Sequence, residues 1–118
     1  MNKTIENVKI TKTFLGREDH GILTCYLTVE GEGFGVSIGG YCLDKYDENK
    51  RKRIAYHKSF ELIDRILEVV GVSAWEELQG KYMRIKSRGF GGRITKIGNI
   101  TKDDWLDFDT FFEEEIDE

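Results

Sequence analysis

The spacing of apolar residues changes twice along this chain, and the change limits the folds that it can adopt. Five short runs alternate apolar and polar side chains, as half-buried β-strands do: residues 4–14, 22–29, 34–43, 81–86 and 94–100. Between the third and fourth runs, apolar residues recur at helical spacing. A chain of 118 residues has room for one modest core. We therefore predict one α+β domain, with an antiparallel sheet of about five strands in the order β-β-β-α-α-β-β, packed on one long and one short helix.

The long helix is predicted to begin at Ser59, a residue type that caps helices, and to end at Gly71. Its buried face is predicted from helical spacing as Phe60, Ile63, Leu67 and Val70, widened by Leu62 and Ile66. The residues Ser73-Ala74-Trp75-Glu76 have the form of a capping box, which predicts a second, short helix that stops at Gly80. The charged residues 44–53 are expected to form a solvated connector.

Charge is unevenly distributed along the chain. Residues 103–118 carry nine acidic side chains and no basic one, whereas residues 1–102 carry 18 basic and 13 acidic side chains, a balance of +5. A mildly basic body suits an anionic ligand better than the net charge of −4 suggests. We predict a domain over residues 1–108 and an acidic, aromatic C-terminal tail over residues 109–118. The simpler interpretation of the last residues is a solubilising terminus.

A glycine-rich loop, Ser87-Arg88-Gly89-Phe90-Gly91-Gly92-Arg93, joins the last two predicted strands. Glycines let the backbone approach a ligand closely, an exposed Phe90 offers an aromatic face, and Arg88 and Arg93 offer planar cationic groups suited to phosphate. The loop is thus a candidate nucleotide-binding site. The alternative is a flexible hairpin whose Phe90 folds back onto the body.

The strand before this loop predicts a cationic face. Alternation places Arg84, Lys86 and Arg88 on one side, and Met83 and Ile85 on the other, which should pack on a helix. The alternative interpretation of the row is the ordinary solvated face of a half-buried sheet, and both interpretations stay open here. A nucleic-acid polymer is not expected as a stable partner, because polymer binding needs a longer basic and aromatic track.

Catalysis is not expected. His20 and His57 could suggest a two-histidine phosphodiesterase, but only His57-Lys58-Ser59 matches the H-x-[ST] pattern, and we find no metalloprotease, P-loop or nucleophile-elbow motif. Cys25 and Cys42 are expected to be free, buried thiols and not a metal site. No cofactor is expected. No run approaches the ~20 apolar residues of a membrane span, and the N-terminus lacks the apolar stretch of a signal peptide, so we expect a soluble intracellular protein.

Several short motifs resemble one family of small phage proteins, the first Thoeris anti-defence family. They are Asp19-His20-Gly21-Ile22, Gly39-Gly40-Tyr41-x-Leu43-Asp44, Val69-Val70-Gly71-Val72-x-x-Trp75-Glu76-x-Leu78-x-Gly80-Lys81 and Ile97-Gly98-Asn99-Ile100-x-Lys102-Asp103-x-Trp105. The resemblance covers residues 5–108. It implies a sponge that sequesters a cyclic nucleotide immune signal, glycocyclic ADP-ribose, without cleaving it, in the cytoplasm of the infected bacterium. It also implies a second site for cyclic oligonucleotides between subunits, and homo-oligomers built from dimers.

The resemblance assigns roles to particular residues. It implies that Phe90 stacks on the adenine and that Asn99 hydrogen-bonds the ligand. Arg88 and Arg93 would contact the pyrophosphate, and Arg84 and Lys102 complete the predicted ligand-binding set. Two features depart from the family pattern: there is no arginine after Arg93, and residues 33–40 are longer and more apolar than expected.

A different class of function uses the C-terminal tail. A protein-binding inhibitor, or a single-stranded nucleic-acid-binding accessory protein, could dock this segment on a basic partner. The apolar residues of the acidic C-terminus, counted from residue 105, are Trp105, Leu106, Phe108, Phe111, Phe112 and Ile116. Deletion of residues 109–118 separates the two ideas, because a sponge should keep its ligand and a tail-docking protein should lose its partner.

Overall fold

The computed structural model describes residues 5–18, 21–55, 58–87 and 93–113, with the backbone alone at 41, 42, 55, 112 and 113. The fold is α+β, as predicted, but the sheet has six strands in the order β3-β2-β1-β6-β7-β8. These strands are β1 (Ile5–Glu18), β2 (Ile22–Gly31), β3 (Phe34–Cys42), β6 (Tyr82–Ser87), β7 (Ile94–Gly98) and β8 (Trp105–Asp107). Every neighbouring pair is antiparallel. The remaining elements are the hairpin β4 (Asp44–Asp47) and β5 (Lys52–Ala55), the helix α1 (Ser59–Val70), a short 3₁₀ helix (Trp75–Glu77) and the helix α2 (Phe108–Glu113).

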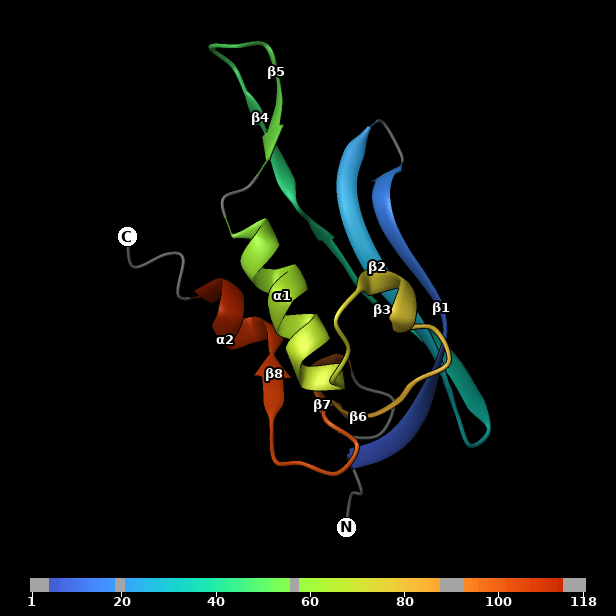
Figure 1. The fold of residues 1–118 in the computed structure, drawn as a ribbon. Coiled ribbons are helices and arrows are strands. Elements are labelled where there is room, and N and C mark those ends of the chain that lie inside the picture. Colours follow the sequence, from blue (N-terminus) through green and yellow to red (C-terminus); the bar gives the residue numbers. More distant parts are fainter. Residues whose placement is uncertain (1–4, 19–20, 56–57, 88–92, 114–118) are drawn as a thin grey trace.

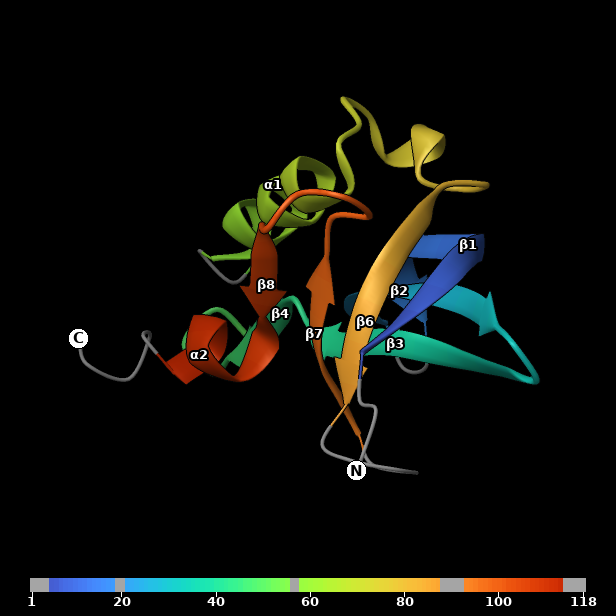
Figure 2. The same ribbon diagram turned by 90° about the horizontal axis from the view of Figure 1, so that it is seen from below.

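Strand β1 belongs to both halves of the sheet. Its first part, Ile5 to Lys9, pairs with β6, and its second part, Lys9 to Glu18, pairs with β2. A bulge between Ile10 and Lys12, near the start of the pairing with β2, lets the strand bend. Figure 2 shows β8, β7, β6 and β1 side by side, with β2 and β3 continuing the sheet beyond β1. The result is a strongly curved sheet with an inner and an outer face.

The connectivity is that of a partly open barrel. Three antiparallel strands, a helix and a returning hairpin that pairs with the first strand are the order of elements in the five-stranded OB fold. Here β8 adds a sixth strand next to β7. Within the described residues, no backbone hydrogen bond joins β3 to β7, so the barrel is open between these strands.

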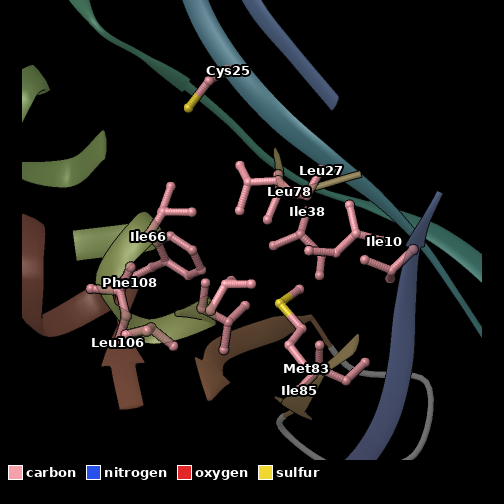
Figure 3. Packing of buried hydrophobic residues seen from close by; sticks show 14 of the residues in the cluster. Ile10, Cys25, Leu27, Ile38, Ile66, Leu78, Met83, Ile85, Leu106 and Phe108 are labelled. Carbon is pink, nitrogen blue, oxygen red and sulfur yellow. The ribbon is translucent and has the colours of Figure 1, made fainter. Parts of the chain in front are cut away.

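The core lies between the inner face of this sheet and α1. In Figure 1, α1 lies between β1 to β3 on one side and β8 with α2 on the other, so the sheet curves around it. Figure 3 shows side chains of all these elements converging. The predicted face of β6 is confirmed, because Met83 and Ile85 are buried. On β2 the buried face is formed by Cys25, Leu27 and Val29. Close packing of this kind is what apolar alternation specifies.

The orientation of α1 differs from the prediction. The buried apolar side chains are Leu62, Ile66, Val69 and Val70, whereas Phe60 is 83% exposed. The helix is apolar on more than half of its circumference, so spacing alone permits two faces, and the curved sheet selects the one that contains Leu62 and Ile66. Gly71 ends the helix as predicted and donates its N–H to the carbonyl of Leu67 at 2.8 Å.

The start of α1 also corrects the prediction of a Ser59 cap. Lys58 occupies the N-cap position, and no side chain caps the helix there. Ser59 is the first helical residue; it is buried, and its hydroxyl donates to the carbonyl of Leu43 at 2.6 Å. The serine therefore holds the helix against the end of β3 instead of capping the helix.

Two other segments differ from the predicted elements. The charged segment 44–53, predicted to be a connector, forms the hairpin β4–β5. The capping-box segment forms only a single 3₁₀ turn, in which the carboxylate of Glu77 accepts the N–H groups of Ser73 and Ala74. The segment after residue 100 adds β8 and α2, and α2 begins at the predicted domain boundary, residue 108. Phe108 is buried, and Phe111 packs against the core.

A buried carboxylate anchors the hairpin to the sheet. The side chain of Asp44 is only 2% exposed. It accepts hydrogen bonds from Nε of Arg53 at 2.9 Å and from the backbone N–H of Leu23 at 3.2 Å, and Arg17 lies 3.6 Å away. The hydrogen bond from Arg53 is the main reason that the pKa of this carboxyl lies below its ordinary value, although burial acts in the opposite direction. Hydrogen bonds to the ionised form outweigh desolvation here.

We expect Asp44→Asn to lower the free energy of unfolding by about 1.5–3 kcal/mol at neutral pH, because Arg53 loses its charged partner. The native pKa is lowered from 3.8, so the ionised carboxyl stabilises the fold above that value. This contribution is lost as the pH falls through the lower native pKa. The difference in the free energy of unfolding between variant and wild type should therefore shrink in acid.

Urea unfolding followed by tryptophan fluorescence at neutral and acidic pH measures both effects. Glu48→Gln in the same hairpin, an exposed position, is the control; equal stability of Asp44→Asn and wild type at neutral pH would contradict the anchor.

Candidate functional site

The candidate site is the open edge of the sheet at β3. Residues 37–40 line two hollows that lie on opposite faces of the strand. The inner hollow measures about 410 Å³ and is completed by Val36, Arg93 and Ile94. The outer hollow measures about 240 Å³ and is completed by Lys12, Tyr26 and Thr28. The same four residues of β3 therefore form part of the wall of both hollows.

Two glycines shape this segment. Gly39 and Gly40 have φ values of 112° and 77°, in the region that other residues rarely adopt. They sit at an irregularity in the β2–β3 pairing, opposite Cys25 and Tyr26. A Cβ at Gly39 would lie 2.8 Å from the carbonyl oxygen of Cys25, so any side chain there would push the strands apart. The backbone of β3 is therefore bare at the point where both hollows meet.

The outer hollow combines an aromatic platform with polar groups. The rings of Phe14 and Tyr26 stack with centroids 5.4 Å apart and planes inclined by 22°. The hydroxyls of Thr28 and Ser37 hydrogen-bond each other at 3.1 Å, and exposed Lys12 lies beside them. Such a surface can stack on a base, hydrogen-bond a sugar or base edge, and attract a phosphate.

The inner hollow presents Arg93 opposite the β3 backbone. The guanidinium is about half exposed and forms an ion pair of 2.9 Å with Asp109 on α2. Arg93 and Ile94, which follow the glycine-rich loop in the sequence, line this hollow, and Ser87, which precedes the loop, pairs with Ile94. Arg88 and Phe90, the two other predicted contacts of the loop, lie outside the described residues.

The other predicted ligand-binding residues, Arg84, Asn99 and Lys102, form a separate cluster at the C-terminal end of β7. The side-chain oxygen of Asn99 accepts the N–H groups of Thr101 and Lys102 at 3.0 and 2.9 Å, and its amide nitrogen donates to the carbonyl of Val69 at 2.9 Å. Arg84 donates to the carbonyls of Asn99 and Lys102, both at 2.7 Å. The cluster fastens the turn before β8 to the end of α1.

These contacts separate the predicted set into two groups. Asn99 and Arg93 stand at opposite ends of β7, about 20 Å apart at the usual rise of a strand. Arg84, Asn99 and Lys102 are together, but Arg93 is not with them. Their role in binding a ligand stays a prediction, and a ligand bond to the oxygen of Asn99 would compete with bonds that hold the turn.

Sequence reasoning missed the residues that face the hollows. The outer hollow is lined by Lys12, Tyr26, Thr28 and Ser37, which alternate in the first three strands with residues of the core face. Their alternation was visible in the sequence. The bulges that bring them into one patch were not, because a bulge depends on the pairing of two strands.

The described residues were also compared with the requirements of a reactive thiol, a metal site and a membrane-spanning helix. Burial raises the pKa of the Cys25 thiol to about 11, so this free cysteine is inert at neutral pH, while the side chain of Cys42 is outside the described set. Across the described ranges, no three His, Cys, Asp or Glu side chains are placed to hold a metal ion. None of the helices described is both long and apolar enough to cross a membrane.

No family model matches this chain, and neither the curated proteins nor the solved structures contain a significant match.

The hydrogen bonds of Asn99 give the first prediction for this region. Asn99→Ala removes three backbone partners of one side chain and should lower the free energy of unfolding by about 1–3 kcal/mol. Chemical unfolding measures this loss. Asn49→Ala is the matched control, because Asn49 is exposed in the β4–β5 turn and is bonded there through its backbone N–H. An Asn99→Ala protein as stable as wild type would show that the turn does not depend on this amide.

Proposed function

We propose that this protein binds a phosphate-bearing nucleotide at the open edge of the sheet and sequesters it without cleaving it. The observation that carries the proposal is the position of Arg93. It stands at the end of the glycine-rich loop and opens on the inner hollow, whose opposite wall is the bare backbone of Gly39 and Gly40. A cation, a glycine-rich loop sequence and exposed backbone groups are the elements of a phosphate site.

The size and lining of the hollow agree with a small ligand. About 410 Å³ falls within the range common for small-molecule sites. Val36 and Ile94 offer apolar contact, and Ser37 offers a hydroxyl. Phe90 would close over the ligand from the loop and stack on its base, which is worth roughly 1–3 kcal/mol.

The ion pair of Arg93 sets a condition for binding. Its partner Asp109 belongs to the acidic C-terminal segment, and both side chains are about half exposed. Exposed pairs of this kind contribute about 0–1 kcal/mol, so a phosphate can replace the carboxylate at little cost. Asp109 of the acidic segment would thus occupy the place beside Arg93 that the phosphate takes when the ligand binds.

The identity of the ligand rests on the family resemblance. We propose a cyclic nucleotide immune signal, glycocyclic ADP-ribose, with cyclic oligonucleotides as further candidates. In the same proposal the protein works in the cytoplasm of an infected bacterium as a homo-oligomer of dimers. Tight retention would follow from slow release once the loop has ordered over the ligand.

Two of the residues suggested for a tail-docking role have partners within the fold. Phe108 is buried, and Phe111 packs against the core with the ammonium of Lys58 at 4.4 Å from its ring. These aromatic side chains already have partners within the fold.

The proposal predicts opposite effects of two neighbouring variants. Arg93→Ala should weaken binding of cyclic ADP-ribose-type nucleotides at least tenfold in calorimetry, since a charge-assisted bond contributes ~1.5–3 kcal/mol, and Phe90→Ala should act similarly. Asp109→Asn should tighten binding a few-fold, because it removes the competing carboxylate. Lys45→Ala on the distant hairpin is the control.

Retention without cleavage is tested separately. The protein is incubated with extracts that contain immune nucleotides, and the released ligand is analysed by mass spectrometry after heating. Release of an intact nucleotide supports sequestration. A chemically altered nucleotide would mean an enzyme, and no captured nucleotide would overturn the proposed function.

A further inference from the structure

The outer face of the sheet carries aromatic and basic side chains over its whole width. Strand register places them there: residues opposite each other in antiparallel strands share a face, and the face opposite to Val8, Ile10, Leu27 and Met83 points away from the core. The aromatic members are Phe14, Tyr26, Tyr82 and Trp105, and the basic members are Lys9, Lys12, Arg84, Lys86 and Lys96. We call this set the outer track.

The register defines the order of the track. At one end Phe14 lies opposite Tyr26. In the middle, Lys9 is the residue shared by both halves of the sheet, with Tyr82 opposite it on β6. Towards the other end, Arg84 lies opposite Gly98, and Gly98 lies opposite Trp105.

Two of the four aromatic rings, those of Tyr82 and Trp105, lie beside cations. Tyr82 is 55% exposed, and the ammonium of Lys9 lies 5.9 Å from its ring centre. Trp105 lies over Gly98, where a Cβ would come within 2.5 Å of the indole, and the guanidinium carbon of Arg84 lies 4.7 Å from the ring. The Phe14–Tyr26 stack is half-buried, which leaves a platform at the rim of the outer hollow.

The charge of the track is positive. Lys12 and Lys86 form no ion pair with any described residue, and Lys96 reaches Asp107 only at 4.0 Å. Asp107 and Glu30 are the acids that register places opposite members of the track. Five basic side chains thus face two acidic ones, although the whole chain is acidic.

We propose that the outer track binds single-stranded nucleic acid. Unpaired bases would stack on Tyr82 and on the Phe14–Tyr26 platform, and the phosphates between them would lie along Lys12, Lys9 and Lys86. Stacking planes can reach bases only when these are unpaired, so a duplex should bind poorly. Phe14 lies five residues after Lys9 in β1, a distance of about 17 Å at the usual rise, which is longer than a single nucleotide needs.

This surface is independent of the proposed sponge site. Arg93 and the inner hollow lie on the core side of β3, whereas the track lies on its other face. Arg93→Ala should therefore leave nucleic-acid binding unchanged, and variants of the track away from β3 should leave binding of the small nucleotide unchanged.

The test is fluorescence anisotropy with labelled oligo(dT) and oligo(U) of about twenty nucleotides and with a duplex of equal length, at low and at physiological salt. We expect binding to at least one of the two single strands and much weaker binding to the duplex. Comparison of oligo(dT) with oligo(U) shows whether DNA or RNA is preferred. Tyr82→Ala should raise Kd roughly tenfold. Lys12→Glu should raise Kd and reduce its salt dependence.

Matched controls come from the hairpin β4–β5. Tyr46 is 54% exposed, almost the same as Tyr82, and Lys45 is exposed like Lys12. Tyr46→Ala and Lys45→Glu should bind like wild type, and chemical unfolding checks that all four variants are folded. The proposal is overturned if neither single strand binds, if the duplex binds equally well, or if the track variants bind no more weakly than the hairpin variants.

Discussion

Strand β1 pairs with β6 through its first residues and with β2 through the rest, and no other strand pairing joins the two halves of the sheet. Strand β1 therefore has to bend between its two partner strands, and the bulge after Ile10 allows this bend. Because the strand bends, the sheet wraps around α1 and a closed core can form from a short chain. The same bend leaves β3 and β7 facing each other without hydrogen bonds at the open side of the barrel.

The open barrel separates two kinds of surface. On the core side of β3, Arg93 and apolar residues enclose a hollow of small-molecule size. On the outer side, the same strand ends a wide face of aromatic and basic residues. The connectivity by itself argues for neither role, because one fold serves many functions. What argues for them is the chemistry of the side chains that the bend brings together.

Three arginines hold separate segments of this fold together. Arg53 neutralises a buried carboxylate, Arg65 joins α1 to Asp104 at 2.7 Å and to the carbonyl of Trp105, and Arg84 binds two carbonyls of one turn. The hydrogen bond between Arg65 and Asp104 also holds the pKa of that aspartate below its ordinary value. A forked, permanently charged donor suits such multiple contacts. In a chain with many charges, an arginine near a ligand-like motif can thus be part of the fold, as Arg84 is.

The sequence by itself determined the class of the fold, the buried face of β6, and the end of α1 at Gly71, because these depend on local periodicity and local backbone geometry. It also indicated Arg93 and the glycine-rich loop as a candidate site. Only the tertiary structure decided that Phe60 faces solvent, that Ser59 and Asn99 bind backbone groups of distant segments, and that Lys12, Tyr26 and Tyr82 share one face. Each of these facts depends on which segment lies opposite, and strand pairing and bulges between residues far apart in the chain set that choice.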